Sequence, residues 1–313
     1  MRRASDSLQR SRLPAQRHSD RLMWITPDRV FYVGLLGVPS IRTMGSVIAY
    51  VAVEGSVHIS IDGGEWQVSE MAVVPPYIPH RIRSEARKIN VIKVEAETVN
   101  LAALPEPLRG SGAVDAPWFV ERVRRCQREL CSRGHDLDLN LMSVDFDHLF
   151  FDGPLITRTI DHRIQVAIDG IKHDPSAPAN AEKCAENAHL SFSRFLHLFK
   201  QEVGVPFRSF RAWKRARRLL HYVNRDSNLA NVALDAGYPD STHFSHSIRQ
   251  VYGLKPKDIF AGSRRLAVYA HALAPSWSAG GLDVSACAEP EERCVSFDHA
   301  MSSKVSQRVI AAP

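Results

Sequence analysis

One amphipathic helix pattern occurs twice in this chain, 49 residues apart. The first copy is "LSFSRFLHLFKQEVG" at residues 190–204, and the second is "DSTHFSHSIRQVYG" at residues 240–253. Apolar residues recur at helical spacing in both copies, and glycine follows both. At this offset Phe195 matches Phe244, Lys200 matches Arg249, Gln201 matches Gln250, and Gly204 matches Gly253.

Each copy is preceded by a shorter helical pattern and a turn. "AEKCAENAH" lies upstream of the first copy and "LANVALDAGYP" upstream of the second. Ser191 and Asp240 stand at the N-cap positions, where a side-chain oxygen accepts from free N–H groups of the first helical turn. Gly204 and Gly253 stand where a left-handed residue ends a helix. Helix, turn and capped helix form a helix-turn-helix unit, so the sequence predicts two such units.

In a DNA-binding unit of this kind, the second helix enters the major groove with its N-terminal residues against base edges. Burial of Phe195 and Phe244 decides which residues of each helix face outward. Hydroxyl, imidazole and guanidinium groups suit contacts with bases and phosphates, and for any one hydroxyl a base contact, a phosphate contact or no contact stays open. The candidate DNA-binding residues are Ser193, Arg194, Leu196 and His197 in the first unit, and Ser241, Thr242, Ser245 and His246 in the second.

Positive charge is concentrated in the same region. The whole chain carries a formal charge of +6, but residues 181–265 hold fifteen Lys and Arg against seven Asp and Glu, a net charge of +8. This favours nucleic acid as the partner, with a solvated helix face as the alternative. In a long helix predicted over residues 206–223, Arg217 and Arg218 are candidate phosphate contacts. Such a rod would hold the two recognition helices about 34 Å apart, one turn of DNA.

Residues 159–265 resemble the DNA-binding region of the AraC/XylS family of bacterial transcription regulators. The resemblance is carried by "SFSRFLHLFKQEVGVPFRSF", by "RARRLL", and by "NVALDAGYPDSTHFSHSIRQVYGLKPKDIF". It implies double-stranded promoter DNA and RNA polymerase as partners, and activation as the sense of regulation. It also places the family's base-contacting positions on Ser193, Leu196, His197, Ser241, Thr242, Ser245 and His246. The chain departs from the pattern at His189, where glycine is common, and at His197 and His246, where arginine is frequent; histidine enters the left-handed region more readily than most residues.

Residues 22–98 have the pattern of an all-β domain. "VHISI" and "EWQV" flank Asp62-Gly63-Gly64 as in a hairpin, and several short strands follow one another without helices between them. The family resemblance implies a cupin-like β-barrel that binds an effector or dimerises. Trp66, Tyr77 and His80 are its candidate effector-binding residues, with ordinary core packing as the alternative. The strands before His80 lack the paired histidines of a catalytic cupin, so we expect no metal, cofactor or catalytic residue.

The remaining segments are expected to link or flank these domains. Residues 99–158 form a linker and a helical block, whose apolar residues either pair two subunits or pack within one chain: Val123, Leu130, Leu139, Leu141 and Leu149. Composition predicts disorder for residues 1–21 and for most of 266–313. No apolar run is long enough to cross a membrane, and five scattered cysteines without a secretory signal favour the cytoplasm.

The sequence thus predicts an α+β chain with an N-terminal cupin-like β-barrel, a helical dimerisation or linker block, and a C-terminal all-α domain at residues 159–265. In that domain a long helix joins two helix-turn-helix units. The predicted function is a cytoplasmic, nucleoid-associated, non-enzymatic transcription regulator, an activator that responds to a small molecule. Two alternatives stay open: a metal-dependent cupin enzyme with a DNA-binding appendage, and an effector-free dimeric regulator.

Overall fold

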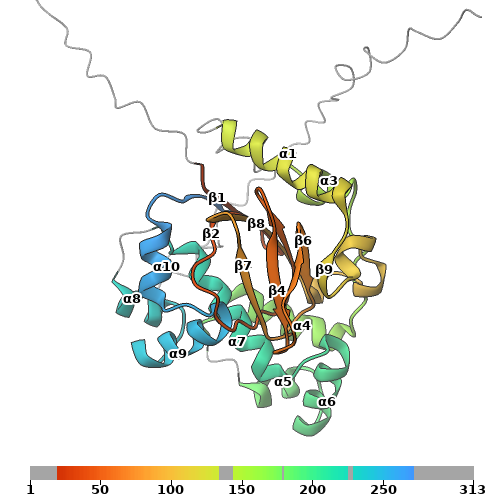
Figure 1. Cartoon of the computed structure of the whole chain (residues 1–313). Coiled ribbons are helices and arrows are strands. Elements are labelled where there is room, and N and C mark those ends of the chain that lie inside the picture. Colours follow the sequence, from red (N-terminus) through yellow and green to blue (C-terminus); the bar gives the residue numbers. More distant parts are fainter. Residues whose placement is uncertain (1–19, 134–143, 178–179, 225–227, 271–313) are drawn as a thin grey trace, which may run out of the picture. The chain divides into compact units, whose positions relative to one another are not determined.

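The computed structural model describes residues 20–133, 144–177, 180–224 and 228–270 (Figure 1). Within these ranges a sheet-rich N-terminal region is followed by a helical C-terminal region, as the sequence predicts. Leu139, Leu141, and most of both predicted tails lie outside the described residues. Among the described helices, none is long and apolar enough to cross a membrane.

The N-terminal region consists of two sheets. The larger sheet has the strand order β10-β1-β2-β8-β3-β6-β9, and the smaller has the order β5-β4-β7. Both sheets are open, and their facing sides share one apolar core that includes Ile48 and Val74 of the larger sheet and Ile59 and Ile82 of the smaller. The strands are β1 (Leu22–Ile25), β2 (Arg29–Leu35), β3 (Ser46–Ala52), β4 (Val57–Ile61), β5 (Gln67–Ser69), β6 (Met71–Val74), β7 (His80–Ser84), β8 (Lys88–Glu95), β9 (Gly112–Val114) and β10 (Ala267–Ala270).

The central strand β8 shows how the larger sheet serves two cores. Successive side chains of a strand point to opposite faces. Ile89 and Val91 therefore share a face, and they pack in the core that also contains the C-terminal helices. Ile92 and Val94 belong to the opposite face, which packs against the helical block. Because both faces are covered, nearly every residue of β8 is buried.

The helical block covers one face of the larger sheet (Figure 1). It comprises α1 (Pro117–Arg133) and α3 (Phe146–Phe151), reached through the short 3-10 turns Ala96–Thr98, Leu101–Ala103 and Glu106–Arg109. Val123 and Leu130 are buried in the core beneath the block, and Leu149 packs against that core. These three residues therefore pack within the chain, and pairing of two subunits through the block stays a prediction.

The C-terminal region contains the two predicted helix-turn-helix units. The first is α5 (Ala181–Asn187) and α6 (Phe192–Val203), and the second is α8 (Leu229–Asp235) and α9 (Ser241–Tyr252). Between them lies α7 (Phe207–Arg218), which is shorter than predicted because the chain continues as a 3-10 turn at Leu219–His221. The region begins with α4 (His162–His173) and closes with α10 (Pro256–Ser263).

The chain then returns to the N-terminal sheet. Ala267–Ala270 form β10, which pairs in parallel with β1 along the register Leu22↔Ala267 to Ile25↔Ala270. The sequence analysis, which expects most of residues 266–313 to be disordered, does not predict this four-residue strand. The hydrogen-bond partner of this strand is β1, which is distant in the sequence. The local sequence pattern therefore does not predict the pairing.

Candidate DNA-binding surface and internal cavity

The turns of the two helix-turn-helix units have the same geometry. In the first, the N–H of His189 donates to the carbonyl of Glu186, and His189 has a φ of 53°. In the second, the N–H of Gly237 donates to the carbonyl of Leu234, and Gly237 has a φ of 77°. The departure at His189 is thus accommodated as predicted, because histidine tolerates the left-handed region. At Gly237 a Cβ would lie 2.6 Å from the backbone of Ser176, so only glycine fits.

The recognition helix of the first unit, α6, is fixed by its cap and its apolar side. Ser191 Oγ accepts from the N–H of Arg194, and Gly204 ends the helix with a φ of 87°. Phe195, Leu198 and Phe199 are buried against α4, α5 and α7. The first turns therefore present a polar surface, in which Ser193, Arg194 and His197 are exposed and Leu196 is half-buried.

The recognition helix of the second unit, α9, has the same design. Asp240 Oδ1 accepts from the N–H groups of Thr242 and His243 at 2.7 and 2.8 Å. Phe244 and Ile248 are buried beneath the helix. The four candidate residues of this unit lie on the outward side: Ser241, Thr242 and His246 are exposed, and Ser245 is half-buried.

The structure does not place Arg217 and Arg218 on that surface. Arg217 is buried; its Nε donates to Glu95 Oε1 at 2.9 Å and its Nη2 to the carbonyl of Thr26 at 2.8 Å. Arg218 donates through Nη1 to Ser176 Oγ and Asp174 Oδ1. Both guanidinium groups thus have partners within the protein, and we leave them out of the proposed interface. The sequence pattern of a polar helix face does not show whether that face is exposed to solvent or packed against a neighbouring domain.

Other arginines of α7 line a notch between the two units. Arg208, Arg211 and Arg215 follow one another at helical spacing and share the notch with Tyr238 and Ser247 of the second unit. Arg208 is exposed, whereas Arg211 and Arg215 are half-buried and donate to the carbonyls of residues 177 and 175. The sequence analysis missed this group, although the spacing of 208, 211 and 215 marks one helix face.

Comparison with known proteins identifies the domain. A family described as a helix-turn-helix domain matches residues 184–262, which hold the second unit and all of the first except the first three residues of α5. A curated relative, the invasion protein InvF of Salmonella typhimurium, is 29% identical over 75 residues, covering 24% of this chain and 35% of InvF. These residues belong to the AraC/XylS family.

A second curated relative is similar over about a third of the chain. The bifunctional transcriptional activator and DNA repair enzyme Ada of Escherichia coli is 28% identical over 109 residues, covering 33% of this chain and 31% of Ada. The chain thus spans about a third of the length of the curated relatives it matches. Over 75% of this chain and 97% of the other, the fold is similar to that of ToxT from Vibrio cholerae, with a TM-score of 0.51 at 11% identity.

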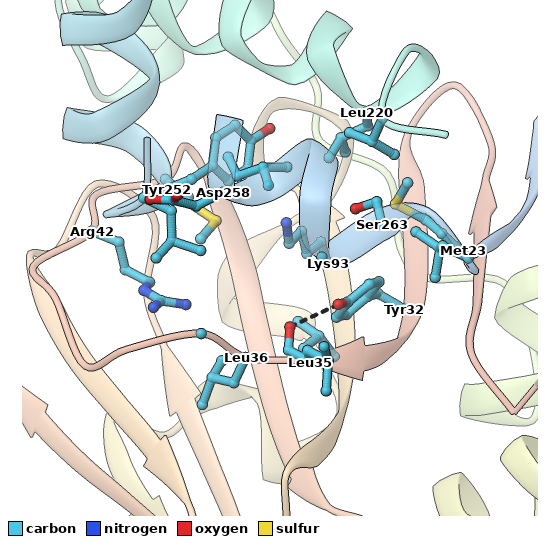
Figure 2. Close-up of a pocket in the computed structure, with 18 of the residues that line it drawn as sticks. Met23, Tyr32, Leu35, Leu36, Arg42, Lys93, Leu220, Tyr252, Asp258 and Ser263 are labelled. Carbon is cyan, nitrogen blue, oxygen red and sulfur yellow. Dashed lines mark hydrogen bonds between the residues drawn. The ribbon is translucent and has the colours of Figure 1, made fainter. Parts of the chain in front are cut away.

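The second AraC/XylS unit packs onto the N-terminal sheet, and a partly open cavity of about 300 Å³ lies between them (Figure 2). Strands β1, β2, β3 and β8 and the segment 35–44 form one wall; α9, α10 and the turn after α7 form the other. A hydrogen bond holds the segment 35–44 to α9: the N–H of Thr43 donates to the carbonyl of Val251 at 3.1 Å. The lining is mainly apolar and includes Met23, Leu36, Met44, Val91, Leu220, Val223, Leu254, Ile259 and Leu266.

The three predicted effector-binding residues do not line this cavity. Trp66 is half-exposed, with the guanidinium of Arg83 over its ring. Tyr77 packs against the core beside Gly45 and α7. His80 is buried one layer behind the cavity wall: its Nε2 bonds the hydroxyl of Tyr50 at 2.8 Å and its Nδ1 the carbonyl of Ile78 at 3.0 Å. Burial lowers the pKa of His80 to about 4, so the ring is neutral at physiological pH.

Two cationic side chains enter the cavity from the N-terminal wall. Figure 2 shows the guanidinium of Arg42 and the side chain of Lys93 directed into it. Lys93 Nζ lies 5.2 Å from the ring centre of Tyr252 on α9. Burial, with Arg217 and Arg42 nearby, lowers the pKa of Lys93 to about 7 despite the presence of Glu95. Sequence reasoning missed both residues, yet Lys93 continues the inward series of Ile89 and Val91 on β8.

A buried ionic cluster ties α7 to the end of β8. We call Glu95, Glu97, Trp213, Lys214 and Arg217 the Glu95 cluster. Glu95 accepts from Trp213 Nε1 at 2.8 Å, from Arg217 Nε at 2.9 Å and from Lys214, which also donates to Glu97 at 2.6 Å. Burial alone would raise the pKa of Glu95, but Lys214 and Arg217 hold it well below its ordinary value. The cluster therefore joins the two regions through full charges.

Proposed function

We propose that this protein is a sequence-specific transcription regulator that binds double-stranded promoter DNA through both AraC/XylS units. One observation carries the proposal: α6 and α9 each expose polar residues on their first turns behind a capped N-terminus and a buried aromatic anchor. Major-groove readers expose such residues there. Ser193, Arg194, Leu196 and His197 read one groove, and Ser241, Thr242, Ser245 and His246 read the next.

The sense of regulation is activation, through contact with RNA polymerase at the promoter, in the cytoplasm and on the nucleoid. The similarity to the transcriptional activator Ada supports this sense. In this proposal the protein catalyses no reaction and acts by occupying a DNA site. A transcription assay with purified polymerase tests the sense directly, because an activator raises the transcript level from its own promoter and a repressor lowers it.

A small molecule in the internal cavity controls DNA binding. The cavity has walls from both the N-terminal sheet and the second AraC/XylS unit, so an occupant contacts both. A ligand that binds one arrangement of the two regions better than another shifts the balance between them. The expected coupling between cavity and DNA is about 1–3 kcal/mol, a change of roughly 5- to 150-fold in DNA affinity.

Electrophoretic mobility shift and footprinting on the DNA flanking the gene test the proposal. The expected result is a specific complex that withstands excess unrelated DNA and protects two adjacent major grooves. Equal affinity for the flanking DNA and for unrelated DNA of the same length would contradict sequence-specific regulation.

Two rival functions have their own tests. An effector-free regulator predicts that no compound in a broad screen raises the melting temperature, whereas an effector-binding cavity predicts that some do. A metal-dependent cupin enzyme predicts stoichiometric iron, zinc or manganese in the purified protein. In the described ranges no cluster of three or more His, Cys, Asp or Glu is arranged to hold a metal, and His58 instead lies beside Glu85 and Arg83.

A further inference from the structure

The recognition helix of the first unit carries two apolar side chains beside its polar ones. Phe192 is the first residue of α6 and is 45% exposed, and Leu196 follows four residues later and is half-buried. Residues four apart lie on the same side of a helix, so these two side chains are neighbours on its surface. We call Phe192 and Leu196 the apolar strip of α6. It lies next to the exposed Ser193 and His197.

The N-terminus of α6 does not need Phe192 for its own stability. The cap is Ser191, whose Oγ accepts from the N–H of Arg194. Where an apolar contact closes a helix N-terminus, it joins the residue before the cap to the fourth residue of the helix. In α6 these are Leu190 and Phe195, and both contribute to the apolar core beneath the helix. Among the described residues, Phe192 is not part of that core.

The second recognition helix lacks this strip. The helix α9 begins at Ser241 as α6 begins at Phe192, so the offset of 49 residues also relates equivalent helical positions. At the two positions of the strip, α9 has Ser241 in place of Phe192 and Ser245 in place of Leu196. The two helices therefore share their caps and their buried aromatic anchors, but they present different chemistry to a DNA groove.

The major groove offers an apolar side chain one matching group. Thymine has a 5-methyl group there, whereas the other base edges present hydrogen-bond donors and acceptors. Contact with the methyl group removes apolar surface from water, which is favourable. Contact with a G·C pair would instead deprive its polar groups of water without replacing their hydrogen bonds. The exposed cations Arg194 and Lys200 on the same helix suit the phosphates of DNA.

We propose that Phe192 and Leu196 read thymine 5-methyl groups, so that the half-site bound by α6 selects T·A pairs through their methyl groups and the half-site bound by α9 does not. This inference rests on the proposed DNA binding and names the base feature that one unit recognises. Because only one of the two helices has the strip, it also determines in which direction the chain lies on its site.

Replacing thymidine by deoxyuridine tests the inference, since the two differ by the methyl group alone. The full-length protein first selects its site from a library of duplexes with a random central sequence. Deoxyuridine is then placed in one half-site at a time, and affinity is measured by competition. We expect a loss of at least about fourfold in one half-site, the value of one buried methyl group, and a loss of less than about twofold in the other.

Matched variants assign the effect to the strip. Phe192→Ser combined with Leu196→Ser gives α6 the two side chains of α9 and should abolish the uracil effect. Phe192→Ser alone should reduce it and is the safer variant, because Leu196 packs partly against the core. Phe192→Leu keeps an apolar side chain and should retain the effect. Val166→Ser is the control, because Val166 is an apolar residue of α4 that is 51% exposed and lies outside both units.

The outcomes separate this inference from the proposed function. Equal uracil effects in the two half-sites, or none in either, would overturn methyl reading by α6 and leave sequence-specific binding in place. A uracil effect of full size in Phe192→Ser would assign it to the shape of the DNA and would also overturn the inference. Failure to select any sequence from the library would refute the regulator, and methyl reading with it.

Discussion

The Nε of Arg217 on α7 lies 2.9 Å from Oε1 of Glu95 on β8, and both side chains are buried. This contact joins an arginine of the DNA-binding region to the last residue of a central strand. Lys214, one turn earlier on α7, reaches the same carboxylate and Glu97 as well. Two charged residues of α7 are therefore turned inward, towards the sheet.

Removing the charge of Glu95 should destabilise the protein strongly. In Glu95→Gln, Lys214 and Arg217 remain buried and lose their shared counter-charge, which costs about 3 kcal/mol or more. Chemical denaturation measures the loss. Glu121→Gln is the matched control, since Glu121 pairs with Arg128 at 2.8 Å but both side chains are about 60% exposed, and such pairs contribute little. Similar stability losses in the two variants would show that the Glu95 cluster does not join the regions.

Lys93→Met should stabilise the ligand-free protein in a pH-dependent manner. The pKa of Lys93 is about 7 in the folded protein and ordinarily 10.5, so between these values the unfolded chain binds more protons and stability rises with pH. The penalty of burying the ammonium is complete below pH 7 and disappears towards pH 10.5. The variant should gain on the order of 3 kcal/mol at pH 6.5, and much less at pH 9.5. A gain that does not change with pH would contradict the buried charge.

His246→Ala should lower specific DNA binding at one half-site. His246 is exposed on the outward side of α9, so its loss should cost about 1–3 kcal/mol at the cognate site and leave binding to unrelated DNA nearly intact. Competition binding measures both affinities. His148→Ala is the control, because His148 is an exposed histidine of α3 in the helical block. An equal loss on all DNA would argue against base readout by His246.

The salt dependence of DNA binding should distinguish an arginine of α7 that contacts phosphate from one that is bonded within the protein. Arg208 is exposed on the notch between the two units, and Arg208→Gln should reduce the slope of log K against log salt concentration by about 1. Arg217→Gln should leave the slope unchanged and lower stability instead, because Arg217 is bonded to Glu95. A reduced slope for Arg217→Gln alone would restore the sequence-based prediction of a phosphate contact.

The parts of the structure that depend on local physics were predictable. Caps at Ser191 and Asp240, left-handed residues at Gly204 and Gly253, and the buried Phe195 and Phe244 all follow from the interactions of a helix with its own ends and apolar side. The prediction of two units therefore agrees with the structure in detail. The DNA contacts of their exposed residues stay predictions.

The parts that depend on distant segments were not predictable from one sequence. From the sequence alone Arg217 is predicted to be exposed to solvent, because nothing local shows that β8 lies against α7. The strand β10 has four residues, and its partner strand is 245 positions away. The cavity was missed for a related reason. Candidates were chosen near the Pro-rich turn, whereas Lys93 and Arg42 become neighbours of one cavity only when the second unit packs onto the sheet.

Hydroxyl-radical footprinting of the specific complex, with variants in each unit, tests the central claim most directly. We expect two protected patches on one face of the DNA, about one helical turn (10–10.5 base pairs) apart. Ser193→Ala combined with His197→Ala should weaken one patch, and Ser245→Ala combined with His246→Ala the other. A single patch, or loss of the same patch in both variants, would contradict two separate groove-reading helices in one chain.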